Sequence, residues 1–353
     1  MSNLFTTRKL LEAIKADDFG GAKTFLRDRY FPNVVEFETE KIDIDLVDSE
    51  GRKLAPFVNP KIGGKILDKS GYKTNSFEAP EVSPMRMTLA EEMLTRSAGE
   101  SVYGSKSPAA RAGEEAKKDL LFLDEVITRR EEAMCAEALF SGRVTIKGDG
   151  YDEVIDFWKD LEEAKKPKTK SAKLWSGDVT AKDILAELRA IRRSMILNGG
   201  FTPTEAIMGT KALEAFLDKL EGDKLLDMRR VDMGAIKPEF LPDHVTYWGY
   251  LRDSGLDIYS YDEQYLNDEN KDVPMVPSHL VLLGSPKVKT TMAYGCCTIA
   301  DPKTQALQYF AQRRVPDSWI NKTPAGRVLQ IKSKPLPIIN QVQGFHVLQP
   351  VEE

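Results

Sequence analysis

The chain has 353 residues, of which 41 % are hydrophobic and 30 % charged, so it can bury a sizeable core and is not disordered as a whole. Its 50 basic and 55 acidic residues give a formal net charge of -5, which excludes the strongly basic balance of a dedicated nucleic-acid binder. The length suggests about two domains. We expect no membrane segment, because no apolar run reaches the roughly 18 residues that span a bilayer. Three cysteines make no disulfide framework, and three histidines offer little imidazole for metal or acid–base chemistry.

Residues 1–40 begin with a short helical pattern and carry a mild positive charge. The first 31 residues hold six basic and four acidic side chains. Pro32 ends the helical pattern, because proline has no amide hydrogen to donate. The side chains of this arm that we expect to meet an acidic partner are Arg8, Lys9, Arg27 and Arg29.

Residues 41–88 read as strand and turn. Apolar and charged residues alternate over 41–48, which predicts a strand with one solvated face. Extended pieces over 54–58, 66–67 and 72–77 follow, and prolines and glycines separate them. A hairpin with so few large apolar side chains is marginal in water, so it must pack on its own domain or on another subunit. The apolar residues available for that contact are Ile42, Ile44, Leu46, Phe57, Val58, Ile66, Tyr72 and Phe77.

A single long helix is predicted over residues 113–141. Its apolar stripe contains Leu120, Leu123, Ile127 and Met134 at helical spacing. Glu114 and Glu115 would lie in its first turn, and Gly142 would end it. At ~1.5 Å per residue the helix would be about 43 Å long. Because its outer face is charged, with Asp124 and Glu131 among its members, we expect a surface strut rather than a core element.

A compact mixed domain is predicted over residues 173–295, after a charged linker at 165–170. A capping box at Thr180 begins a helix that ends near Asn198. A second amphipathic helix covers 213–220. The strands expected in this domain are 205–208, 245–250, 256–261 and the fully apolar 279–283.

Two charged segments could make contacts between molecules. Residues 262–272 carry five acidic side chains and one lysine, and the acidic candidates are Asp262, Glu263, Asp268 and Glu269. Residues 311–335 carry six basic side chains and one acidic, and include Arg313 and Arg314. Such a basic segment could face phosphate or an acidic neighbour, although solvated surface is the commoner role. Strands are expected at 305–310, 327–331 and 336–340.

The sequence contains no recognisable active site. Gly63-Gly64-Lys65-Ile66 lacks the Ser or Thr of a phosphate-binding loop. Asp243-His244 could be half of a catalytic pair, but a surface role is the commoner one for such a pair. Adjacent Cys296 and Cys297 are interpreted as structural. We therefore predict no catalytic, cofactor-binding or metal-binding residues.

The order of elements and several local strings resemble a known family. The strings are Phe5-Thr6-Thr7-Arg8-Lys9-Leu10-Leu11, Ala55-Pro56-Phe57-Val58-Asn59-Pro60-Lys61-Ile62-Gly63-Gly64-Lys65-Ile66, Phe77-Glu78-Ala79-Pro80, Tyr294-Gly295-Cys296, Arg314-Val315-Pro316-Asp317-Ser318-Trp319 and Ser333-Lys334-Pro335-Leu336-Pro337. Together they resemble tailed-phage major capsid proteins of the lambda type, the phage capsid protein E family, from about residue 4 to 348.

The resemblance implies an α+β, Hong Kong 97-type capsid fold and assigns names to the predicted pieces. Residues 1–40 would be the N-arm and 41–88 the E-loop, a β extension laid across a neighbouring subunit. Residues 89–172 would form the peripheral domain, with its spine helix at 113–141. The axial domain would span 173–295, and return strands in 296–353 would complete the peripheral domain.

The resemblance also implies a structural function. The chain would assemble as hexamers and pentamers into an icosahedral head that encloses double-stranded DNA without sequence-specific binding. It would be a virion component assembled in the bacterial host cytoplasm, with no enzymatic activity, cofactor or membrane contact. The implied partners are copies of itself, a separate scaffold protein, a portal and a decoration or cement protein. An encapsulin-like nanocompartment shell and a hydrolase built on Asp243-His244 are the alternatives.

Overall fold

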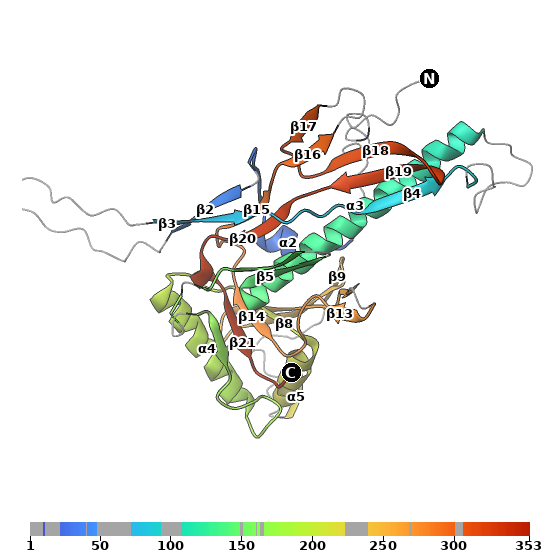
Figure 1. The fold of residues 1–353 in the computed structure, drawn as a ribbon. Helices are drawn as coiled ribbons and strands as arrows, with labels where there is room; N and C mark the ends of the chain where they lie inside the picture. Colours follow the sequence, from blue (N-terminus) through green and yellow to red (C-terminus); the bar gives the residue numbers. More distant parts are fainter. Residues whose placement is uncertain are drawn as a thin grey trace, which may run out of the picture.

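The structure is a computed structural model that describes residues 10, 22–39, 41–47, 72–92, 107–148, 151–159, 161–162, 166–222, 239–267, 270–300 and 306–353. The fold is α+β, with few helices and many strands (Figure 1). The helices are α2 (Phe25–Tyr30), α3 (Pro108–Ser141), α4 (Ala181–Asn198), α5 (Thr210–Gly222) and the short 3-10 helix η2 (Val342–Gly344).

A seven-stranded mixed sheet forms the lower part of the molecule in Figure 1. Its order is β7 (Lys168–Lys170), β21 (His346–Gln349), β14 (Val281–Gly284), β8 (Glu205–Met208), β11 (Leu256–Tyr261), β10 (Val245–Leu251) and β9 (Glu239–Leu241). Ala206 and Met208 of β8 pack on α4 and α5, whereas Ile207 lies on the other face, in the main hydrophobic core that the sheet shares with α3. Burial on both faces explains why residues 206–208 of β8 and all of β14 are apolar without alternation.

The predicted capping box of α4 is confirmed. The Thr180 hydroxyl accepts a hydrogen bond from the Asp183 amide, and the Asp183 carboxylate accepts one from the Thr180 amide. The predicted apolar face is buried against the sheet, and the helix ends at Asn198 as expected. Capping and hydrophobic periodicity therefore located this helix correctly.

A second, three-stranded sheet packs on the N-terminal half of α3. Its order is β18 (Val315–Lys322), β19 (Ala325–Lys332) and β4 (Met85–Leu89). Leu329 and Ile331 of β19 are buried with the α3 residues Leu120, Leu123 and Ile127. The apolar stripe predicted for the long helix is thus covered by a strand about 200 residues later in the sequence.

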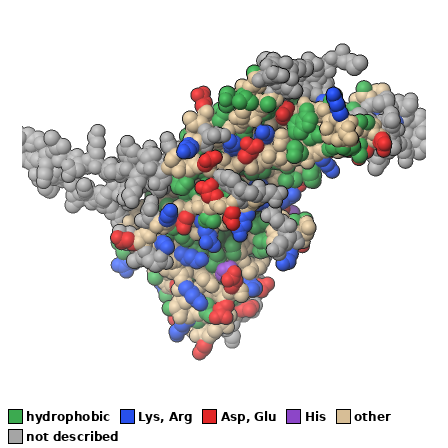
Figure 2. All heavy atoms as spheres, in the orientation of Figure 1, with side chains coloured by type: hydrophobic (Ala, Val, Ile, Leu, Met, Phe, Trp, Pro, Cys, Tyr) green, Lys and Arg blue, Asp and Glu red, His purple; other side chains and the backbone are tan. Residues whose placement is uncertain are grey.

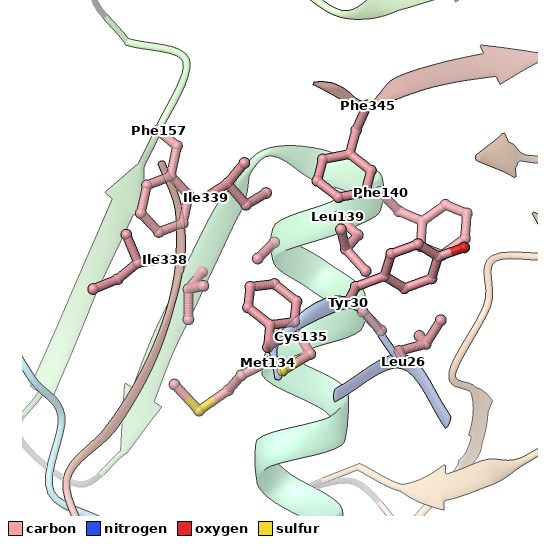
Figure 3. Close-up of a cluster of buried hydrophobic side chains, with 14 of the residues drawn as sticks. Leu26, Tyr30, Met134, Cys135, Leu139, Phe140, Phe157, Ile338, Ile339 and Phe345 are labelled. Carbon is pink, nitrogen blue, oxygen red and sulfur yellow. The ribbon is translucent and has the colours of Figure 1, made fainter. Parts of the chain in front are cut away.

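The C-terminal half of α3 lies in the main hydrophobic core. Figure 3 shows Leu26 and Tyr30 of α2, Leu139 and Phe140 of α3, and Ile338 of the later strand β20 converging there. A third sheet borders this core, with the order β1 (Asn33–Glu36), β15 (Thr290–Tyr294) and β20 (Pro335–Ile339). The core therefore joins the N-terminal segment, the long helix and the return strands.

Four two-stranded antiparallel sheets complete the described fold. They are β2 (Lys41–Val47) with β3 (Tyr72–Glu78), β5 (Arg143–Gly148) with β6 (Tyr151–Asp156), β12 (Gln264–Leu266) with β13 (Asp272–Pro274), and β16 (Cys297–Ala300) with β17 (Leu307–Phe310).

The long helix differs from its prediction in two respects. It begins at Pro108, five residues early, because Ser107 caps it and proline suits the first helical position. Glu114 and Glu115 therefore lie beyond its first turn, and at ~1.5 Å per residue the helix is about 51 Å long. The assignment of Glu131 to an exposed outer face was wrong, because its side chain is fully buried. Only the N-terminal half of α3 resembles a strut.

Two segments have more structure than the sequence suggested, and one predicted strand is shorter. The linker expected at 165–170 contains strand β7, and the acidic segment 262–272 contains β12 and the start of β13. The apolar strand expected at 279–283 begins at Val281. The sheet also departs from the range 173–295, because β7 and β21 lie outside that range and β15 within it belongs to another sheet.

Gly142 occupies a position that excludes a side chain. Its φ is +68°, and a Cβ there would lie 2.0 Å from Cε2 of the buried Trp158. We expect Gly142→Ala to lower the free energy of unfolding by at least about 2 kcal/mol, from left-handed backbone strain plus the clash. Gly148→Ala is the matched control in denaturant titrations, because a Cβ at Gly148 meets nothing within 4 Å. Equal stability of the two variants would contradict this interpretation.

Candidate assembly surfaces

The hairpin β2–β3 projects from the body, on the side opposite the N-terminal end of α3 (Figure 1). Its strands pair in register from Lys41 opposite Glu78 to Val47 opposite Tyr72. Among the described residues neither strand has a second partner strand. An isolated two-stranded hairpin is marginally stable in water, so the two outer edges favour addition of another chain.

The base of this hairpin is anchored in its own subunit. Ile42 is fully buried in the main core, and Phe77 packs edge-on against Phe157 with ring centroids 6.0 Å apart. Ile44, Leu46 and Tyr72 lie farther along the two strands by register. Of the other hairpin residues predicted to contact a neighbour, Phe57, Val58 and Ile66 lie outside the described residues.

The basic segment that begins at residue 311 contributes to a buried ion cluster. Glu131 of α3 accepts hydrogen bonds from Arg27 (2.9 Å), Arg313 (3.0 Å) and Arg314 (2.5 Å). Burial alone would raise the pKa of Glu131, but the charges of Arg314, Arg313 and Arg27 outweigh it and lower the pKa to about 2. Arg314 also binds Asp124 at 2.6 Å. This cluster fastens α2 and the start of β18 to the long helix.

The neighbouring residue Glu132 holds the first turn of α2. Its two carboxylate oxygens accept hydrogen bonds from the backbone N–H groups of Leu26 (2.7 Å) and Arg27 (2.9 Å). Burial raises the pKa of Glu132 to about 7, although these backbone donors favour the carboxylate. Glu131 and Glu132 are adjacent in sequence and fully buried, yet their pKa values shift in opposite directions. The arginine contacts lower the pKa of Glu131, whereas burial raises the pKa of Glu132.

A second set of side-chain contacts connects α2 to the seven-stranded sheet. Arg29 donates to both carboxylate oxygens of Glu205 in β8, at 2.7 and 2.5 Å, and the Tyr30 hydroxyl donates to the same carboxylate at 3.0 Å. The guanidinium also stacks 4.8 Å from the ring centroid of Tyr259. The hydrogen bond that Arg29 donates to Glu205 raises the pKa of Arg29. The six residues of α2 thus connect α3 to the sheet.

The pKa of Glu132 predicts a pH dependence of stability. A carboxyl whose pKa rises from 4.5 unfolded to about 7 folded binds more protons in the fold, so stability falls as pH rises from about 4.5 to 7. We expect the free energy of unfolding of Glu132→Gln to vary less over this range than that of the native chain. Denaturant titrations at several pH values measure the difference, and Glu125→Gln, on the exposed side of α3, is the control. Parallel curves for the native chain and Glu132→Gln would contradict the assignment.

The side chains predicted to make charge contacts with other molecules differ in their surroundings. Arg27, Arg29, Arg313 and Arg314 are all committed to ion pairs within the chain, and Arg314 is buried. The expectation of an exposed basic patch at 311–335 is therefore wrong for Arg314 and for the buried Lys334. Asp262 is exposed, and Glu263 contacts His244. Arg8, Lys9, Asp268 and Glu269 lie outside the described residues.

The surface also exposes apolar side chains that the sequence analysis did not single out. Figure 2 shows hydrophobic side chains on the upper limb, which is built by α3 and the strands β16–β19. The exposed large hydrophobic residues of these strands are Leu307, Tyr309 and Ile320. Phe240 on β9 is 83 % exposed. Alternation of apolar and polar residues along half-buried strands could have indicated these positions. The sequence predicted only some of these strands.

The described residues contain no group of three or more His, Cys, Asp or Glu side chains arranged to hold a metal ion. Asp243 pairs with Lys23 at 2.7 Å and His244 contacts Glu263, so the adjacent Asp243 and His244 serve separate contacts. None of the described helices combines the length and the apolar character that crossing a bilayer requires.

Comparison with known proteins identifies both fold and family. The fold resembles a candidate capsid protein of a prophage in E. coli CFT073, at 20% identity and a TM-score of 0.69, covering 98% of this chain and 99% of that one. It also resembles a phage-related protein from Bordetella bronchiseptica RB50, at 11% identity and a TM-score of 0.53, covering 99% and 98%. The capsid of cyanophage A-1(L) matches at 12% identity and a TM-score of 0.51, covering 94% of both chains.

These likenesses support the expected Hong Kong 97-type fold. A search of curated proteins finds no match. The sequence model of the family described as phage major capsid protein E matches residues 6–346. This match favours a phage capsid over an encapsulin-like compartment or a hydrolase. Because it spans almost the whole chain, it identifies a structural component of a phage head shell: the protein belongs to the phage major capsid protein E family.

Proposed function

We propose that this chain assembles as hexamers and pentamers into the icosahedral head that encloses the double-stranded DNA of a phage. The observation that carries the proposal is the hairpin β2–β3, which is anchored at Ile42 and Phe77 but has no third strand among the described residues. Laid on a neighbouring subunit, it would gain the partner that it lacks. Because each subunit would both give and receive this contact, many weak interfaces would add up in a closed shell.

The proposed domains follow from the same assignment. Residues 1–40 act as N-arm and 41–88 as E-loop, and 89–172 with 296–353 form the peripheral domain around the spine helix α3. The axial domain, 173–295, meets its copies at the centres of hexamers and pentamers. Since β7 and β21 belong to its sheet, we extend the axial domain to include them.

The proposed partners are a separate scaffold protein, a portal and a decoration or cement protein. The net charge of -5 suits a container that encloses DNA without sequence-specific contact. Assembly would take place in the cytoplasm of the bacterial host before the chain becomes part of the virion.

Expression of the chain with and without its scaffold protein, followed by negative-stain imaging, tests the proposed function. We expect closed shells of uniform size with the scaffold, and aberrant or unassembled material without it. Extraction of the shells and analysis of the enclosed material separates a DNA-filled head from a compartment that encloses protein. A chain that stays monomeric at high concentration in the presence of the scaffold would contradict the proposal.

A further inference from the structure

The seven-stranded sheet ends in two exposed strands of different sequence. Among the described residues, β7 pairs only with β21 at one edge, and β9 pairs only with β10 at the other. All three residues of each of these edge strands are exposed. The free N–H and C=O groups of an exposed edge favour contact with another chain. Both edges are therefore candidate contact surfaces.

The β9 edge carries the apolar side chains expected of an interface. Phe240 is 83 % exposed and Leu241 is 37 % exposed. Tyr250 of β10 is also exposed, beyond the part of β10 that pairs with β9. Aromatic side chains that become buried on association commonly carry most of the binding energy of an interface. Phe240 therefore has the properties of an anchor residue.

The two edges are also complementary in charge. Residues 165–177 around β7 contain five lysines and no acidic residue, whereas residues 239–263 over β9, β10 and β11 contain six acidic residues and one basic. Asp243, Asp253 and Glu263 of the acidic side have partners within the chain. Among the described residues no ion pair involves Glu239 of β9 or Lys168 and Lys170 of β7. These three side chains are available to another molecule.

The sheet topology fits a contact between the β9 edge of one copy and the β7 edge of the next. The pairing pattern makes β7 and β9 run in the same direction, so a head-to-tail neighbour would bring them together in parallel. A contact between two different edges generates a ring when its rotation closes. In Figure 1 the hairpin β2–β3 lies on the side of β21, the strand that pairs with β7, and away from β9. The hairpin and the β7 edge would therefore reach the same neighbour.

We propose that a second copy of this chain occupies each sheet edge, with Phe240 as the apolar anchor and Glu239 facing Lys168 and Lys170 of the neighbour. The inference rests on the proposed function, because it assigns the contact that closes hexamers and pentamers. It adds a specific pair of surfaces to that function.

Disulfide trapping tests this contact directly. Lys168→Cys combined with Glu239→Cys places one thiol on each edge, on the face where Glu239 would meet the lysines, and the three natural cysteines are buried. After oxidation of assembled shells, we expect covalent rings of five and six copies on a non-reducing gel. Each single variant is the control and should give no rings. Shells of the double variant that form normally but yield no linked copies would overturn this inference and leave the proposed function intact.

Charge reversal keeps the inference testable if the cysteine variant assembles poorly. Glu239→Lys is expected to lower the yield of shells at least roughly tenfold, because it sets like charges against each other. Adding Lys168→Glu and Lys170→Glu should restore the yield. Glu214→Lys, an equal charge change at an exposed position of α5, is the control. Failure of the triple variant to recover would overturn the pairing, whereas failure of the native chain to form shells would overturn the proposed function itself.

Discussion

Replacing Glu131 by glutamine is expected to lower the free energy of unfolding of the unassembled chain by about 3–5 kcal/mol. The substitution keeps the size of the side chain but removes the negative charge that Arg27, Arg313 and Arg314 share. Losing one partner of a buried ion pair leaves uncompensated charge at the site. Denaturant titration of the purified subunit measures the loss.

Glu125→Gln on the same helix is the matched control for this prediction. Glu125 pairs with Arg129 at 2.7 Å in a partly exposed position, and such a pair contributes at most about 1 kcal/mol. The lowered pKa of Glu131 adds a second expectation, because its contribution is present above about pH 4.5 and is lost as the pH falls towards 2. If Glu131→Gln and Glu125→Gln had similar free energies of unfolding, the buried ion cluster would not contribute substantially to the stability of the subunit.

Shortening the hairpin β2–β3 is expected to abolish shell formation while the subunit still folds. Asp43 lies opposite Ser76, so an Asn-Gly turn joining these two residues would close a two-residue hairpin of ordinary geometry. The buried base at Ile42 and Phe77 is retained. We expect the stability of the subunit to change by less than about 1 kcal/mol, because the removed part lies beyond that base. Imaging of assembly reactions measures the loss of shells.

Point substitutions separate the apolar contribution of the hairpin from its length. Ile44→Asn with Leu46→Asn should lower the yield of shells at least roughly tenfold, because burying one such side chain contributes about 1.5–3 kcal/mol. Asp43→Asn with Asp45→Asn, on the alternate positions of the same strand, is the matched control and should assemble normally. If the shortened chain or the Ile44/Leu46 variant formed shells as efficiently as the native chain, the hairpin would not be an intersubunit element.

The parts of the fold that follow from local chemistry could be predicted from the sequence. The capping box at Thr180, the apolar face of α4 and the alternation over residues 41–48 are all local signals, and each led to the correct element. Family resemblance supplied the overall assignment, because order and strings extend over almost the whole chain. Neither source required knowledge of long-range contacts.

The remainder depends on contacts between distant parts of the chain. Glu131 looks like one charge among many on an exposed helix face, and only the arrival of Arg27 and Arg313 from 104 and 182 residues away makes it a buried centre. The sequence of strand β7 predicts a linker, because its exposed lysines are as compatible with a loop as with the edge of a sheet. Strand β18 was missed because Pro316 and polar residues hide its pairing with β19.

Hydrogen exchange of the hairpin amides, in unassembled subunits and in closed shells, tests the central claim most directly. Peptides covering Lys41–Val47 and Tyr72–Glu78 are compared with peptides of the C-terminal half of α3, which lies in the core of each subunit. We predict fast exchange of the outer hairpin in free subunits and strong protection in shells, with little change for α3. A hairpin already as protected in a free, fully folded subunit as it is in the shell would contradict the account.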